Sequence, residues 1–247
     1  MIEQPERLPI VPETAGSRVA LAVYAQASER LSFVPTFLRA FAAVGEEALV
    51  EAWAQCLALH DAPGTVAATR KLAAAARPDL PYRPSQAVRD AVAPFVQELP
   101  FLQLAVASFA VTVDGRLAAG PRPSLALDAT GAPRPSQPSV PEFVGEHPLF
   151  PEIRATYGTT YVPRIHLALA AHGLLEEAWA GVGWFLASRA GREHTDALRA
   201  LAESSALAFP DAAFLKAPGA ARVVAEFRQA LPLNLTFALA AGHPQPR

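Results

Sequence analysis

Three basic side chains lie just after prolines that are expected to open helices, and these residues are well placed to do chemistry. Arg164 and His166 follow Pro163 within one turn, and Arg39 follows Pro35 in a similar way. A neutral imidazole, with an ordinary pKa of about 6.5, can take a proton from water near neutral pH. An arginine can bind a carboxylate through two parallel hydrogen bonds. The free N–H groups of a first helical turn also favour an anion.

Asn234 is a fourth candidate, because it lies in the stretch 233–241, which is otherwise very apolar. A buried amide without a partner costs roughly 1–3 kcal/mol, so it has to find a ligand, a water molecule or a backbone group. We predict that His166 is a general base. We also predict that Arg39 or Arg164 binds a substrate carboxylate and that Asn234 orients water or substrate.

Each of these four residues also has a purely structural interpretation. His166 fits a hydrogen-bonded interior histidine, and Arg39 and Arg164 fit ion pairs at an interface or a solvated helix face. Asn234 can bond to a backbone carbonyl of a neighbouring helix. The sequence leaves both interpretations open, so the surrounding elements have to be considered.

The chain repeats itself about half its length further on. Three motifs occur in the same order in both halves: Val34-Pro35 and Val162-Pro163, Glu51-Ala52-Trp53 and Glu177-Ala178-Trp179, and Leu99-Pro100 and Leu231-Pro232. The offset is 128 residues at the first proline and 126 at the tryptophan. A duplicated unit suggests a pseudo-dimer, and ligand sites are common at such an interface.

Apolar residues recur at helical spacing in both halves, and no long segment alternates at period two. We therefore predict an all-α fold of two tandem helical repeats, with about five or six helices in each. The first repeat covers residues 1–120, a Pro/Gly-rich linker covers 121–149, and the second repeat covers 150–247. We expect Pro100 and Pro232 to interrupt the helices that precede them, because an internal proline lacks a donor.

The composition excludes several classes of function. Hydrophobic residues make up 51% and charged residues 18%, and the formal net charge of −2 gives no electrostatic footprint for nucleic acid or an anionic membrane. Cys56 is the single cysteine, so a disulfide framework, a cysteine-rich zinc site and a CxxC redox centre are excluded. The histidines lack ligand spacing, so we expect no metal and no cofactor. With no signal region and no long apolar run, a cytoplasmic location is the default.

The order of the repeated motifs resembles that of the group I D,L-2-haloacid dehalogenases, the DehI-type family. In that family each repeat has a helix, a Val-Pro or Gly-Pro break, a second helix, a Leu-Ala-Trp segment, and a break before an apolar helix. The three motif pairs given above are the corresponding places in this chain. The resemblance covers most of both repeats and implies an all-α pseudo-dimer.

The resemblance also implies hydrolytic dehalogenation of small 2-haloacids without a metal ion or a covalent intermediate. In that family an aspartate activates the attacking water, three residues after the proline that opens the second helix of the second repeat. Counting from Pro163 puts His166 at this position, and aligning the following Ala-Leu-Ala run puts Ile165 there. The asparagine that holds the water in the family corresponds to Leu99.

The function we predict is therefore base-activated attack of water on a small carboxylic acid or a similar metabolite. One alternative is an inactive family member that binds a small ligand or a protein at the repeat interface, as the replacement of both family residues favours. Another is an AhpD-like peroxidase or decarboxylase, whose redox form needs a second cysteine. A homodimer is a further expectation.

Overall fold

The computed structural model describes residues 7–116, 125, 127, 135–209 and 217–242. This described part is built of α-helices and contains no strand, so the predicted all-α class is confirmed. The helices are α1 (Arg18–Leu31), α2 (Thr36–Val44), α3 (Glu46–Asp61), α4 (Thr65–Ala75), α5 (Gln86–Val113), α6 (Phe150–Tyr157), α7 (Arg164–Ala171), α8 (Leu175–Ala187), α9 (Arg189–Ala206) and α10 (Ala220–Gly242).

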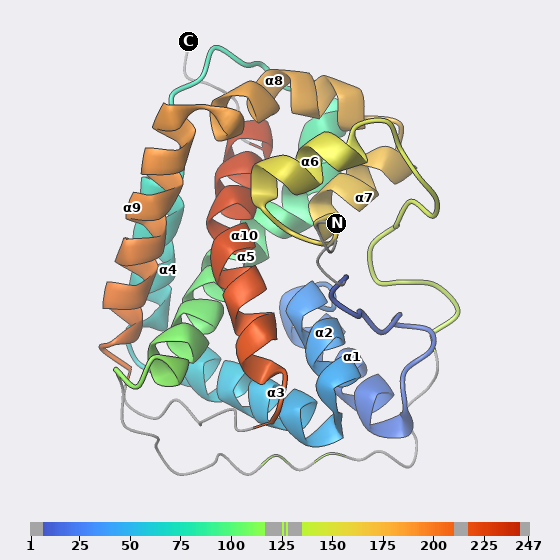
Figure 1. Ribbon diagram of the computed structural model, residues 1–247, viewed down its shortest axis with the longest axis vertical. Helices are drawn as coiled ribbons and strands as arrows, with labels where there is room; N and C mark the ends of the chain where they lie inside the picture. The colour runs from blue at the N-terminus through green and yellow to red at the C-terminus, as the bar shows by residue number, and fades with distance from the viewer. Residues whose placement is uncertain (1–6, 117–124, 126, 128–134, 210–216, 243–247) are drawn as a thin grey trace, which may run out of the picture.

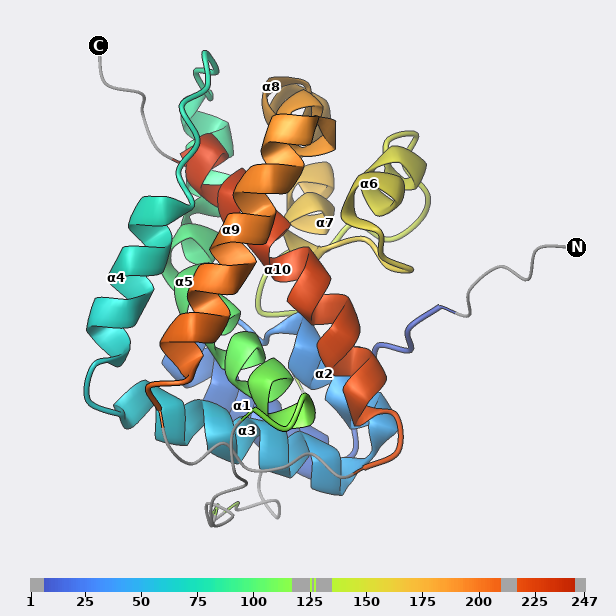
Figure 2. The ribbon, with the colours of Figure 1, turned by 60° about the vertical axis from the view of Figure 1, so that its left-hand side comes forward.

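The long helices α5 and α10 pack against each other at the centre of the molecule (Figure 1). Helices α1–α3 cover one end of this pair and α6–α8 the other, while α4 and α9 lie side by side along one flank (Figure 2). Helix α2 packs on α10, and α7 packs on α5. Each half therefore places its short second helix against the long helix of the other half.

The prediction that Pro100 and Pro232 interrupt their helices is wrong. Helix α5 continues through Pro94 and Pro100, and α10 continues through Pro232. An internal proline costs about 3 kcal/mol or more. Burial outweighs this cost, because nearly every residue from Leu99 onward in α5 is buried and each large apolar side chain contributes about 1.5–3 kcal/mol.

Matching contacts tie the third helix of each half to the first. Trp53 Nε1 donates to Gln26 Oε1 at 2.9 Å, and Trp179 Nε1 donates to Glu152 Oε1 at the same distance. In both halves the partner lies 27 residues before the tryptophan. These contacts support the duplication, which remains a prediction of the sequence together with the pseudo-dimer.

Part of the predicted linker, 121–149, lies outside the described residues. Its end, 135–149, is irregular and contacts both halves. Ser139 Oγ accepts from the N–H of Val34 at 3.0 Å, and the N–H of Phe143 donates to the carbonyl of Leu167 at 3.1 Å. The domain boundaries themselves remain predictions.

One helix of the described part, α5, is long and apolar enough to cross a membrane. Within the window that meets this criterion, 78% of the residues are buried inside the fold. That degree of burial is typical of a core helix.

Candidate functional site

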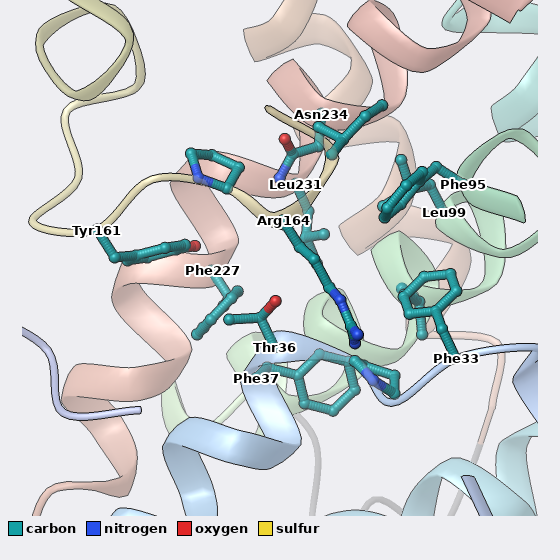
Figure 3. A pocket seen from close by; sticks show the side chains of 14 residues that line it. Phe33, Thr36, Phe37, Phe95, Leu99, Tyr161, Arg164, Phe227, Leu231 and Asn234 are labelled. Carbon is teal, nitrogen blue, oxygen red and sulfur yellow. The ribbon is translucent and has the colours of Figure 1, made fainter. Parts of the chain in front are cut away.

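A small cavity lies between the two halves, where the starts of α2 and α7 face the middle of α5 and α10 (Figure 3). Its volume is about 30 Å³, counted as the space open to the centre of a water molecule. One water needs about 10–15 Å³ by this measure, so the cavity takes a ligand of only a few non-hydrogen atoms. Fourteen residues line it: Phe33, Pro35, Thr36, Phe37, Phe95, Leu99, Leu102, Tyr161, Pro163, Arg164, Ile165, Phe227, Leu231 and Asn234.

These fourteen residues form seven pairs across the two halves. Four pairs are separated by 128 residues: Phe33 and Tyr161, Pro35 and Pro163, Thr36 and Arg164, and Phe37 and Ile165. Three pairs are separated by 132 residues: Phe95 and Phe227, Leu99 and Leu231, and Leu102 and Asn234. The cavity therefore lies between positions that correspond to each other in the predicted repeat.

The two halves differ in the chemistry they bring to this cavity. The second half supplies Tyr161, Arg164 and Asn234, whereas Thr36 is the polar lining residue of the first half. The first half otherwise contributes aromatic rings, proline and leucine side chains. Polar groups are thus concentrated on the wall formed by the start of α7 and the middle of α10.

Arg164 lines the cavity, but its guanidinium already has charged partners within the protein. It forms ion pairs with Glu13 and with Glu142, the latter at 2.9 Å between Nε and Oε1. It also donates to the carbonyl of Val34. Burial lowers the pKa of Arg164, and the two carboxylates act in the opposite direction. Because its side chain is only 3% exposed, these ion pairs are largely shielded from water.

Arg39 joins the same charge cluster from the other half and does not line the cavity. Its Nη1 pairs with Glu142, and its Nε donates to the carbonyl of Val11 at 3.1 Å. We call Glu13, Arg39, Glu142 and Arg164 the interface charge cluster. Two arginines face two glutamates here, so the cluster carries no net charge. The substrate-binding role of either arginine remains a prediction, and a ligand carboxylate would have to compete with two internal ones.

Asn234 lines the cavity, as its predicted role requires. It is 7% exposed, and within the described part of the protein its Oδ1 has no hydrogen-bond partner. The Tyr161 ring packs at a tilt against Phe227 with ring centroids 5.1 Å apart, and its hydroxyl likewise has no partner among the described residues. Burial raises the pKa of Tyr161 well above its usual value, so the phenol stays protonated.

His166 lies outside the cavity, in an aromatic cluster behind it. It is fully buried, its Nε2 is 2.9 Å from the hydroxyl of Tyr157, and its ring contacts those of Trp179 and Phe237. Burial lowers the pKa of His166 to about 3, so the imidazole is neutral at physiological pH. The catalytic role of His166 remains a prediction, and it would have to act from outside the cavity.

The one-residue ambiguity of the family alignment has a structural counterpart. Ile165 lines the cavity, and the next residue, His166, faces the other way, because one residue rotates a side chain by about 100° around a helix. Arg164 and Asn234 share the cavity, whereas Arg39 and His166 do not line it. Tyr161 is a residue that the sequence analysis did not select, although its difference from Phe33 in the repeat was a usable signal.

No cluster of three potential metal ligands occurs among the residues that the structure describes. Cys56 is buried in the core, and this burial raises the pKa of its thiol.

The fold and the cavity together define an all-α protein with a small, mostly apolar cavity between two halves. Solved structures of D-2-haloacid dehalogenase have this fold. A complex with L-LA is similar with a TM-score of 0.73 and 16% identity, covering 98% of this chain and 99% of the other. A mutant complex with D-2-CPA gives a TM-score of 0.69 and 15% identity, with 97% of each chain covered. No protein-family model and no curated protein sequence matches the chain.

Proposed function

We propose that this chain is a divergent, dehalogenase-like relative of the group I 2-haloacid dehalogenases. We further propose that its cavity binds a small carboxylic acid as the substrate of a water-dependent hydrolysis. The observation that carries the proposal is the cavity itself, which is enclosed by seven corresponding residue pairs from the two halves. The fold shared with D-2-haloacid dehalogenases over nearly the whole chain supports it.

The cavity has the kind of lining that a small 2-substituted acid requires. Rings of Phe33, Phe37 and Phe95 offer an apolar surface to the carbon chain, and the opposite wall offers Tyr161 and Asn234 to the polar end. Small-molecule sites are commonly of this kind, mostly apolar with a few placed polar groups.

Hydrolysis by an activated water also needs a base that takes a proton from the water. Among the cavity's fourteen described lining residues there is no carboxylate and no imidazole. The carboxylates of Glu13 and Glu142, which pair with the lining residue Arg164, are held in the interface charge cluster. His166, the base predicted from the sequence, would need a route for the proton past the α7 backbone.

A second candidate function, ligand binding without turnover, is favoured by this same lining. Such a protein would retain the cavity of its relatives and bind a small acid there. The two candidate functions differ only in whether the bound acid is hydrolysed, so a single experiment separates them.

The experiment measures halide release from racemic 2-chloropropionate and 2-bromopropionate, together with the stabilisation that each acid gives to the folded protein. Thr36→Phe fills the cavity from its half-buried rim, and Thr69→Phe adds the same ring on α4, away from the cavity. Halide release by the wild type and Thr69→Phe, but not by Thr36→Phe, supports hydrolysis. Stabilisation without halide release supports the binding protein. If the acids cause neither halide release nor stabilisation, both candidate functions are refuted.

A further inference from the structure

We infer that Tyr161 and Asn234 form a hydrogen-bonding pair that selects a ligand carrying a hydroxyl group over one carrying a halogen on the same carbon. The inference rests on the proposed function, because it concerns the cavity that we assign to a small acid. It assigns the recognition of the polar group to uncharged side chains instead of to the two arginines.

Within the described part of the chain, both side chains carry unsatisfied polar atoms and line the same cavity. Tyr161 and Asn234 are 8% and 7% exposed, and both line the cavity. Neither the Tyr161 hydroxyl nor Asn234 Oδ1 has a hydrogen-bond partner among the described residues. Buried polar atoms are nearly always paired in folded proteins, so two orphaned atoms at one cavity point to a ligand that completes them.

These two atoms demand different chemistry from a ligand. An amide oxygen only accepts, and a protonated phenol donates. A ligand hydroxyl can donate to Asn234 Oδ1 and accept from Tyr161 at the same time. A carbon-bound chlorine has no proton to donate, so it would leave Asn234 Oδ1 unpaired in a site shielded from water.

The guanidinium of Arg164 is engaged by Glu13 and Glu142, so the described lining residues leave no unopposed positive charge to dominate recognition. Figure 3 shows Tyr161 across the cavity from the rings of Phe33 and Phe95, with the Asn234 amide above it. The ligand would therefore place its polar group against Tyr161 and Asn234 and its carbon chain against the aromatic wall.

The duplicated lining supplies matched variants for a test. Tyr161→Phe and Asn234→Leu give each position the residue of its counterpart in the first half, Phe33 and Leu102. Both substitutions keep the approximate shape of the side chain and remove an unpaired buried atom, so they are compatible with folding. Gln103→Leu is the control, because Gln103 is buried, its Oε1 has no partner among the described residues, and it does not line the cavity.

The experiment is a calorimetric titration of the wild type and the three variants with 2-hydroxypropionate, 2-chloropropionate and propionate. The uncharged 2-hydroxypropionamide is a fourth probe. We expect the wild type and Gln103→Leu to bind the hydroxy acid about tenfold more tightly than the chloro acid, the effect of one completed hydrogen bond. Asn234→Leu should abolish this preference, and Tyr161→Phe should reduce it.

The outcomes separate this inference from the proposed function. Equal binding of hydroxy and chloro acids, or a preference that survives Asn234→Leu, overturns the inference and leaves the binding of small acids intact. If only 2-hydroxypropionamide binds to the wild type, and Asn234→Leu loses this binding, the inference is supported and a carboxylic acid ligand is refuted. Binding of no probe at all overturns both.

Discussion

Replacing His166 by leucine should make the fold less sensitive to acid. The imidazole is fully buried against Tyr157, Trp179 and Phe237, and this burial lowers its pKa to about 3. In the unfolded chain a histidine has a pKa of about 6.5. As the pH falls below 6.5, the unfolded chain therefore binds a proton that the folded protein does not. The stabilisation from the neutral imidazole is complete above pH 6.5 and is lost progressively toward pH 3.

The size of the effect follows from the difference between the two pKa values. Each pH unit below 6.5 removes about 1.4 kcal/mol, so the free energy of unfolding should fall by about 2 kcal/mol between pH 7 and pH 5 on account of His166. His166→Leu should lack this part of the loss. Leucine is a suitable replacement because Leu38 stands 128 residues earlier in the repeat and is itself fully buried.

The assay is urea unfolding of both proteins at pH 7 and pH 5, with the exposed His172→Gln as control. The quantity compared is the change in the free energy of unfolding between pH 7 and pH 5. The cost of losing the contact with Tyr157 is the same at both pH values, so it cancels. The control should behave as the wild type does. If the wild type and His166→Leu lose the same free energy, the imidazole titrates as it does in water. It would then be open to solvent, as a catalytic base at the cavity has to be, and the burial argument would be refuted.

Other substitutions test the packing around the site. Glu142→Gln leaves two buried arginines short of a carboxylate and should destabilise the fold by about 3–5 kcal/mol in urea unfolding, whereas the mostly exposed Glu146→Gln should cost less than about 1 kcal/mol. Equal effects would mean that the interface charge cluster is open to water. Phe237→Ala removes a ring of zero exposure beside His166 and should cost about 3–5 kcal/mol of thermal or chemical stability. Burial raises the pKa of Cys56, so a thiol reagent at pH 8 should label it only after unfolding, and rapid labelling of the native protein would contradict that burial.

Most of the fold could be predicted because helical periodicity is a local property of the sequence. The helix after Pro35 and the helix after Pro163 were both expected, and both occur. The interruptions expected at Pro100 and Pro232 do not occur. The cost of an internal proline can be estimated from the local sequence. The burial that offsets this cost depends on how α5 and α10 pack against each other, which the local sequence does not specify.

The site could be predicted only in part, because it depends on contacts between distant segments. Asn234 was selected as a polar residue in an apolar helix, and it does line the cavity. The partners of Arg39 and Arg164 could not be foreseen, since Glu13 and Glu142 lie far from them in sequence. The position of His166 depended on a rotation of one residue around α7, which a motif alignment cannot settle.

The proposed function requires the cavity between the halves to bind a small carboxylic acid. The most direct measurement is a calorimetric titration of the wild type, Thr36→Phe and Thr69→Phe with 2-chloropropionate at neutral pH. This function predicts saturable binding with one site per chain for the wild type and Thr69→Phe, and none for Thr36→Phe, because the added ring fills the space. Equal binding by all three proteins, or binding by none, would contradict it.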